Sequence, residues 1–400
     1  MRLENEIAKG PASSTRTQVE VVTEGSAFAA LRGEWDALLD ESSAGIFNAW
    51  EWLYPWYRRI GTDRALRILT ARDRAGRLMG LMPLGLERRR VLGRTVRRLH
   101  FLGETHVGSD YLDVVARKGL EEPVARLFAE HLRDTRAEWD VLDLTDFDSA
   151  SPTLRILRET FGSGFEHCVS KRYICPFEPI PPTEAFDAFL KRTGRRDNYL
   201  RRRKWLEKQP GYRIEKVESP EGLAPAMTDF FRLHSMRWAD DGGSQGIKGP
   251  GVEAFHRDAT HFLAERKQLR MYTLKLGDQA LASVYGILHR GKFIYFQSGY
   301  DPEWRSKSVG LVLVGETFKD TFEGKLEEYD FLRGTEGYKS EWTTQQRQTV
   351  SVRVNAPTLQ GRWLGLVEAA AKLARDVAKR ALPRDTVERI RRFRRRLMAV

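Results

Sequence analysis

The chain has 400 residues, of which 41% are hydrophobic and 30% are charged, a globular composition that excludes a disordered, collagen-like or coiled-coil protein. Its net charge of +12 is concentrated in residues 191–208 (+7) and 361–400 (+8), which argues against nucleic-acid binding over the whole surface and favours one phosphate-binding site, or an anionic surface at the tail. No apolar stretch approaches the roughly 18 residues of a membrane span, the charged N-terminus resembles no secretory signal, and Cys168 and Cys175 are too few for a disulfide scaffold, so we expect a cytoplasmic protein.

The first part of the chain is predicted to form one α+β domain. Residues 1–17 are polar and expected to be flexible, and residues 18–175 alternate between strand-like and helix-like hydrophobic patterns. Ser151 followed by Pro152 is typical of a helix start. Strands are predicted at 19–25, 65–90, 94–103, 109–116 and 139–147, and helices at 28–42, 46–61, 121–135 and 151–162.

A proline-rich segment, residues 174–186, is predicted to be a linker to a second domain. That domain, residues 176–357, repeats the order of the first, and residues 358–400 are predicted to be a basic amphipathic helical tail. In the second domain strands are predicted at 212–219, 269–301, 327–334 and 349–356, and helices at 195–208, 222–241, 252–268 and 308–324.

The two domains are predicted to be related copies. A shift of 203 positions places Arg67 on Arg270 and Thr70 on Thr273, within the same order of elements. We therefore expect an α+β (mixed α/β) fold with two tandem domains, each a mostly antiparallel sheet flanked by helices, followed by the helical tail.

The tail has two interpretations. Beyond Pro383 an apolar stripe runs through six arginines. The stripe predicts one of two arrangements. In the first, the tail docks on nucleic acid or on an anionic membrane surface, the latter placing the protein at the inner membrane face. In the second, the tail is a helix packed on its own protein with a solvated basic face. The stripe consists of Val387, Ile390, Phe393 and Leu397.

Motifs of several enzyme classes are absent from the sequence, including HExxH, the Walker A loop and a GxGxxG that follows a strand. His256 and His261 are five positions apart, which does not place both on one helix face, so we expect no metal site. Residues 242–246 spell G-x-S-x-G but follow a predicted helix, whereas a hydrolase elbow follows a strand. We interpret them as a flexible loop and a candidate lid.

The most informative segment precedes the helix that begins near Val309. Residues 305–308 read RSKS, so Arg305 and Lys307 bring positive charge to a helix start, where exposed amides attract anions. Gly310 allows an anion to approach the backbone. The segment predicts either a diphosphate site or an ordinary serine-capped helix.

Four segments carry a family resemblance. RRDNYLRRRKWLEK (195–208), RLHSMRW (232–238), DQALASVYGILHRGKFIYFQSGYDPEWRSKSVG (278–310) and YDFLRGTEGYKSEW (329–342) resemble the GNAT acyltransferase superfamily, in its BioF-like or CelD-like (cellulose biosynthesis) branch related to Fem-type transferases. The resemblance covers the second domain, and the duplication extends it to the first.

This resemblance implies an acyl-CoA-dependent N- or O-acyltransferase, with acetyl-CoA as the expected co-substrate, no metal, and a sugar or polysaccharide precursor as acceptor. The family's diphosphate loop is only approximated by Arg305, Ser308 and Gly310, which leaves a Fem-type aminoacyl-tRNA-dependent transferase as an alternative. A non-catalytic scaffold in polysaccharide synthesis is the third reading. The basic helix 195–208 is correspondingly predicted to bind CoA or tRNA phosphates, to bind an acidic acceptor, or to be solvated.

The resemblance also places the site residues. Strand 280–287 is expected to supply a backbone N–H for the oxyanion, its small residues leaving room for the cofactor, although small residues also let a helix pack. Asp330 is expected to be either a buried partner of a basic group such as Arg333 or a functional carboxylate. The candidates for proton transfer are Tyr300, Asp301, Glu336, Tyr338 and Lys339, and those for cofactor binding are Ala282, Ser283, Arg305, Ser306, Lys307, Ser308, Val309, Gly310 and Leu311.

Overall fold

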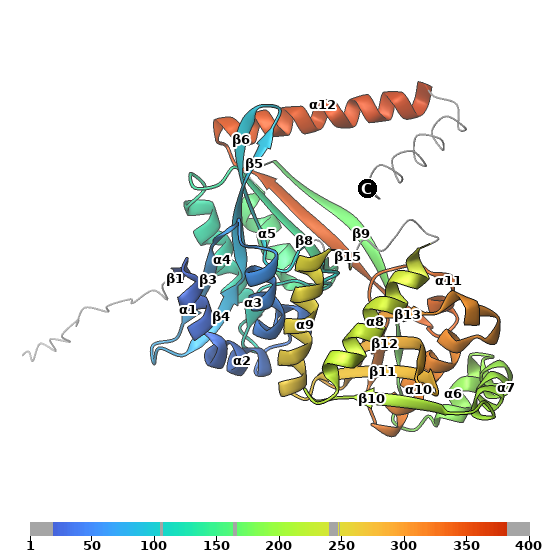
Figure 1. Cartoon of the computed structure of the whole chain (residues 1–400). Helices are drawn as coiled ribbons and strands as arrows, with labels where there is room; N and C mark the ends of the chain where they lie inside the picture. Colours follow the sequence, from blue (N-terminus) through green and yellow to red (C-terminus); the bar gives the residue numbers. More distant parts are fainter. Residues whose placement is uncertain (1–18, 105–106, 163–165, 240–246, 248, 382–400) are drawn as a thin grey trace, which may run out of the picture.

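The computed structural model describes residues 19–104, 107–162, 166–239, 247 and 249–381. It shows helices packed on a long mixed sheet, with a smaller sheet beside it and a C-terminal helix, α12 (Leu359–Ala381), across one end (Figure 1). The predicted α+β fold class and the helical segment after the last strand are confirmed. The predictions for residues 1–17, for 242–246 and for the apolar stripe beyond Pro383 lie outside the described residues.

The N-terminal half contributes the small sheet and one end of the long one. The predicted helix start at Ser151 is confirmed, because its side chain accepts a hydrogen bond from the Thr153 amide at 3.2 Å and Pro152 follows. The strands are β1 (Val19–Val22), β2 (Ala65–Leu66), β3 (Ile68–Arg72), β4 (Leu78–Met82), β5 (Leu84–Val91), β6 (Arg94–Phe101), β7 (Val115–Ala116) and β8 (Val141–Asp148), and the helices are α1 (Gly25–Ala30), α2 (Arg32–Asp40), η1 (Ile46–Asn48), α3 (Trp50–Arg59), α4 (Glu121–Asp134) and α5 (Pro152–Phe161).

The C-terminal half contributes the other end of the long sheet. Helix α9 also reaches the N-terminal half, where Phe255 packs edge-on against Trp52 of α3. The strands are β9 (Glu166–Pro179), β10 (Tyr212–Val217), β11 (Leu269–Leu276), β12 (Gln279–His289), β13 (Lys292–Tyr300), β14 (Glu328–Asp330) and β15 (Gln345–Asn355), and the helices are α6 (Phe186–Arg192), α7 (Arg196–Glu207), α8 (Leu223–Trp238), α9 (Pro250–Glu265), η2 (Pro302–Lys307), α10 (Val309–Glu323) and α11 (Gly337–Ser340).

One sheet joins the two halves, in the order β10-β11-β12-β13-β14-β9-β15-β8-β6-β5-β2. The two long strands β9 and β15 run antiparallel at its centre, where β15 pairs with β9 on one edge and β8 on the other (Figure 1). The predicted linker at 174–186 is therefore wrong in its first part, because residues 174–179 belong to β9. Pro176 and Pro179 lie in that strand opposite β15 and β14, and the predicted boundary at 175/176 falls inside it.

The repeated order of elements is visible in the strand pairing. In the N-terminal half β1, β3 and β4 are antiparallel neighbours, and β6 leads through α4 to the parallel strand β8. In the C-terminal half β10, β11 and β12 are antiparallel neighbours, and β13 leads through α10 to the parallel strand β14. Each half thus combines an antiparallel meander with one β-α-β crossover, which supports the predicted duplication.

Helix α8 approaches β13 so closely that only glycine fits at position 299. A Cβ atom on Gly299 would overlap the backbone of Leu233 and His234. We expect Gly299→Ala to lower the free energy of unfolding by about 3 kcal/mol, because the backbones must move apart. Denaturant titration measures this. Gly33→Ala, where a Cβ atom meets open space in helix α2, is the control and is expected to gain about 0.5–1 kcal/mol. Equal stability of Gly299→Ala and the parent chain would contradict the packing.

Candidate functional site

Strands β13 and β14 pair over a short length and then part. The parallel ladder runs from Lys292–Glu328 to Ile294–Asp330, whereas β13 continues to Tyr300. From Tyr295 onwards, no described strand pairs with the β14-facing edge of β13. Backbone amides and carbonyls on an unpaired edge are available to hydrogen-bond an extended ligand.

A cavity of about 320 Å³ lies beside this edge, between β12, β13, the start of α10, and α11. It brings together most of the predicted site residues, although they come from five separate elements, β12, β13, η2, α10 and α11. Those that line it are Ala282, Ser283, Tyr300, Arg305, Ser308, Val309, Gly310, Leu311 and Tyr338.

The start of α10 is shaped for an anion. Ser308 adopts a left-handed conformation (φ 58°, ψ 38°) where η2 ends, and its side chain does not cap the helix. Within the described residues, the amides of Val309, Gly310 and Leu311 have no backbone acceptor. Arg305 lines the cavity beside them. Unpaired first-turn amides, the helix dipole and one guanidinium together favour a phosphate group.

The structure places Ser306 and Lys307, predicted as cofactor ligands, outside the lining of this cavity. Both face the basic helix α7: the Ser306 carbonyl accepts a hydrogen bond from Arg202 at 3.1 Å, and the Lys307 ammonium lies 4.6 Å from the ring centroid of Trp205. These contacts fix the η2 turn and hold α7 beside the start of α10.

Three of the predicted proton-transfer residues also lie outside the cavity. Asp301 is buried and accepts a hydrogen bond from the Glu303 amide at 3.0 Å, so it caps η2. Lys339 is buried, donates to the Arg333 carbonyl at 2.6 Å and lies 3.1 Å from the Glu336 carboxylate. The structure therefore gives Asp301, Glu336 and Lys339 positioning contacts instead of a place at the cavity.

The predicted oxyanion strand is paired on both of its edges. Strand β12 pairs with β11 on one edge and with β13 on the other over residues 282–287, so its backbone amides are engaged in the sheet. Ala282 and Ser283 line the cavity only with their small side chains. The unpaired backbone amides beside the cavity are instead those on the edge of β13 beyond Ile294.

Other cavity residues were missed by the sequence analysis. Tyr295 and Ser298 lie on the same strand as Tyr300, and period-two alternation along β13 is the signal that would have found Ser298. Tyr295 is five positions from Tyr300 and reaches the same cavity because the β12–β13 register is irregular between them. Arg237 ends α8, with its guanidinium 5.3 Å from the ring centroid of Tyr300. The remaining missed residues are Val284, Gly299, Leu313, Val314, Glu341 and Trp342.

Two tyrosines make the cavity a proton-donating environment. The ring centroids of Tyr295 and Tyr338 are 6.5 Å apart. Burial raises the pKa of both phenols above the usual value near 10, and the neighbouring Tyr295 and Glu336 raise that of Tyr338 further. Tyr338 therefore stays protonated at neutral pH, so its hydroxyl can donate a hydrogen bond but is not available as a general base.

Helix α7 is anchored by ion pairs to its own protein. Arg203 lies 2.5 Å from Glu316 of α10, which also accepts a hydrogen bond from Tyr199, and Arg195 pairs with Glu341 at 2.7 Å. Much of the predicted basic face is thus neutralised within the fold. Among the described residues Arg201, Lys204 and Lys208 form no ion pair.

Asp330 is a buried ion-pair partner, but not of Arg333. Its carboxylate lies 3.0 Å from Arg347 and accepts a hydrogen bond from the Tyr111 hydroxyl at 3.1 Å. Arg333 instead binds Asp110 of the N-terminal half at 2.8 Å. Both contacts tie the end of β14 to its surroundings, where β13 and β14 separate.

Buried His234, packed over Gly299, predicts a pH effect. Burial lowers its pKa to about 4, so the unfolded chain takes up a proton near pH 6.5 that the folded chain refuses until about pH 4. Stability contributed by this group is lost as the pH falls through that window. We expect the stability advantage of the parent chain over His234→Gln to shrink by about 2 kcal/mol between roughly pH 7.5 and 4.5, measured by urea unfolding. A pH-independent difference would contradict a neutral, buried imidazole.

Two features are absent from the described residues. No three His, Cys, Asp or Glu side chains in this part of the chain come together as a metal site. None of its helices combines the length and apolar character needed to cross a bilayer.

The sequence comparison identifies the domain that carries the cavity. Residues 193–340 match the family described as acetyltransferase (GNAT) domain. The matched range contains η2, α10 and the β12–β14 segment, and with them most of the residues that line the cavity. No protein with a curated function matches the sequence.

Solved structures share the fold over most of the chain at low identity. One described as FemX superposes with a TM-score of 0.57 and 13% identity, covering 83% of this chain and 96% of that one. A conserved protein of unknown function from Bacteroides thetaiotaomicron superposes with a TM-score of 0.53 and 12% identity, covering 85% of this chain and 100% of that one. A third structure, from Agrobacterium fabrum, is the C-terminal domain (DUF2156) of a protein named as a putative lysylphosphatidylglycerol synthetase. It superposes with a TM-score of 0.51 and 11% identity, covering 86% of this chain and 96% of that one. The specific branch suggested by the sequence is not among these neighbours.

Proposed function

We propose that the protein is an acyl-CoA-dependent N- or O-acyltransferase whose donor binds in the β13–α10 cavity. The observation that carries this proposal is the meeting of an unpaired strand edge and an unpaired helix start at one cavity, within the matched GNAT domain. An extended donor with a diphosphate fits both features: the edge suits its amide-containing arm, and the amides of residues 309–311 suit its phosphates.

The residues of the cavity have different roles in this proposal. Acyl-CoA, when bound, supplies an activated thioester. The amides of Val309–Leu311, with Arg305, hold the diphosphate, and the edge of β13 positions the arm. The protonated Tyr338 hydroxyl is placed to donate a proton to the departing thiolate. Acetyl is the expected acyl group, and the acceptor expected from the resemblance is an amine or hydroxyl of a sugar or polysaccharide precursor.

A Fem-type transferase that uses aminoacyl-tRNA is the alternative. The fold similarity to FemX and the position of α7 support it, because Arg202 and Trp205 contact the η2 turn directly beside the cavity. Exposed Arg201, Lys204 and Lys208 on α7 could then contact nucleic-acid phosphates. A scaffold without catalysis is the remaining alternative.

Calorimetric titration with acetyl-CoA tests these readings. The proposal expects saturable binding at one site. Absence of acetyl-CoA binding, together with tRNA binding that weakens steeply with salt, would favour the aminoacyl-tRNA reading. Binding of neither would favour the scaffold.

We propose separately that the C-terminal segment docks on an anionic membrane surface. Helix α12 packs on the body mainly through Leu364, which contacts Val96 and Val141, while Leu359, Leu366 and Leu373 are 81%, 72% and 67% exposed. These leucines recur every seven residues on one face, and residues 361–400 carry +8. Co-sedimentation with phosphatidylglycerol vesicles, and its absence with phosphatidylcholine vesicles, is the expected result. Equal sedimentation with the two kinds of vesicle would contradict an electrostatic contribution to membrane binding.

A further inference from the structure

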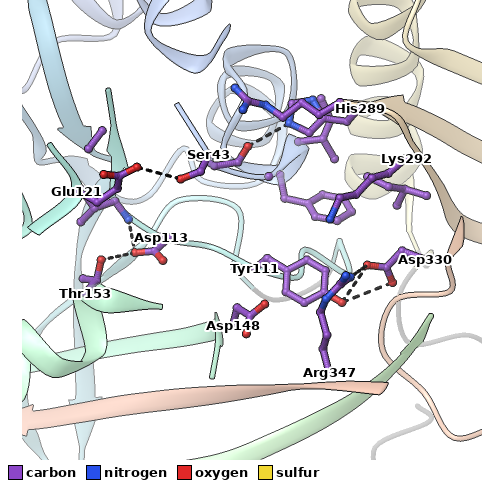
Figure 2. Close-up of a pocket in the computed structure, with 18 of the residues that line it drawn as sticks. Ser43, Tyr111, Asp113, Glu121, Asp148, Thr153, His289, Lys292, Asp330 and Arg347 are labelled. Carbon is purple, nitrogen blue, oxygen red and sulfur yellow. Dashed lines mark hydrogen bonds and ion pairs between the residues drawn. The ribbon is translucent and has the colours of Figure 1, made fainter. Parts of the chain in front are cut away.

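A second cavity, of about 220 Å³, lies between the two halves and away from the donor site. Figure 2 shows its lining. Ile294 and Tyr295 are consecutive on β13, and because successive side chains point to opposite faces, Ile294 lines this cavity whereas Tyr295 lines the first. The two cavities therefore lie on opposite faces of the sheet.

The wall from the N-terminal half is acidic. Asp113, Glu121 and Asp148 line it, and none of them has an ion-pair partner among the described residues (Figure 2). The Asp113 carboxylate accepts hydrogen bonds from the Thr153 hydroxyl at 2.6 Å and from the Val114 amide at 2.7 Å. Burial raises the pKa of Asp113 to about 6, and the nearby Asp148 adds to the shift. This wall lacks positive charge.

The wall from the C-terminal half is basic. Arg290 and Lys292 come from the turn between β12 and β13, and Figure 2 shows Lys292 across the cavity from Asp113. Arg290 donates to the backbone carbonyls of Leu39 and Asp40 and has no ion-pair partner among the described residues. Lys292 lies 3.1 Å from Glu328, which Arg347 also neutralises. Lys292 and Arg347 together balance Glu328 and Asp330, so the excess positive charge of this wall is that of Arg290.

The remaining charged group is already balanced. Asp330 is paired with Arg347 and accepts a hydrogen bond from Tyr111. A metal ion does not fit, because no three carboxylate or imidazole groups of the described residues converge closely enough to hold one. The volume far exceeds the roughly 15 Å³ that one water needs, so there is room for a small organic molecule.

We propose that this cavity binds a compact zwitterion, with its ammonium group against Asp113 and Asp148 and its anionic group against Lys292 and Arg290. Opposite charges on facing walls reward a ligand that carries both charges, since either charge alone leaves one wall uncompensated. The proposal does not depend on the acyl-CoA site, which lies on the other face of the sheet.

Ligand-observed NMR with 4-aminobutyrate and 6-aminohexanoate as probes tests the proposal, with butylamine and butyrate as single-charge controls. At least one amino acid is expected to bind at millimolar concentration, and at least about tenfold more tightly than either control. Binding of butylamine as tight as that of both amino acids, or no saturable binding of either amino acid, would overturn the proposal.

Two variants locate the site. Asp113→Asn keeps an oxygen that can accept from Thr153 and Val114, and Lys292→Met leaves Glu328 paired with Arg347, so both are expected to fold. Each should weaken probe binding about tenfold or more. Asp134→Asn on α4, a 66% exposed carboxylate, is the matched control and should change nothing. Retained probe binding in both Asp113→Asn and Lys292→Met would overturn the proposed site. All three variants are expected to bind acetyl-CoA like the parent chain, and this separates a failure of the zwitterion site from a failure of the donor site.

Discussion

A chain carrying Arg305→Ala and Gly310→Glu is expected to lose acetyl-CoA binding while keeping its fold. Gly310 occupies the second position of α10, where a Cβ atom would meet Tyr300 at an ordinary contact distance of 3.5 Å. A glutamate there is favourable for the helix, because negative charge at an N-terminus complements the dipole. Its carboxylate would repel a diphosphate at about 4 Å by several kcal/mol, which corresponds to a loss of roughly a hundredfold or more in affinity.

The matched control is Gly33→Glu. Gly33 also occupies the second position of a helix, α2, and a Cβ atom there meets open space. It should bind acetyl-CoA like the parent chain. Thermal unfolding checks that all variants fold, and unchanged affinity of the double variant would show that the diphosphate does not lie at the start of α10.

Tyr338→Phe is expected to lower kcat by roughly 100- to 1000-fold with little change in acetyl-CoA affinity. The hydroxyl is the only group removed, and its raised pKa means that it is protonated at neutral pH. Loss of a general acid costs rate in this range. Steady-state kinetics with an amine acceptor, together with calorimetry, measures both quantities.

Tyr54→Phe serves as the control, since Tyr54 lies on α3, stacked on Trp50 in the N-terminal half. It should leave kcat unchanged. A Tyr338→Phe enzyme with normal kcat would remove Tyr338 from the chemistry, whereas equal losses of kcat and of acetyl-CoA affinity would indicate a role in shaping the cavity.

Local patterns predicted the elements and the start of the site. The capped helix at Ser151, the strand at 141–148 and the turn into α10 follow from spacing within a few residues, and the structure confirms them. The site residues nearest α10 came from the same kind of argument, because a helix start and its flanking charges are visible in a short segment.

Long-range pairing is what the sequence could not reveal. Prolines at 176 and 179 predict a linker, yet these residues lie in β9 because β15, far along the chain, supplies its partner. The unpaired edge of β13 was hidden for the same reason, because it depends on where β14 stops pairing. Asp301 and Lys339 are chemically suitable, but contacts made by the fold direct them to backbone groups.

The most direct test of the central claim is a crystal structure of the protein with acetyl-CoA. We expect diphosphate oxygens within about 2.7–3.2 Å of the Gly310 and Leu311 amides, and the arm of the donor alongside residues 295–300. A diphosphate bound elsewhere, with the start of α10 untouched, would contradict the proposed donor site.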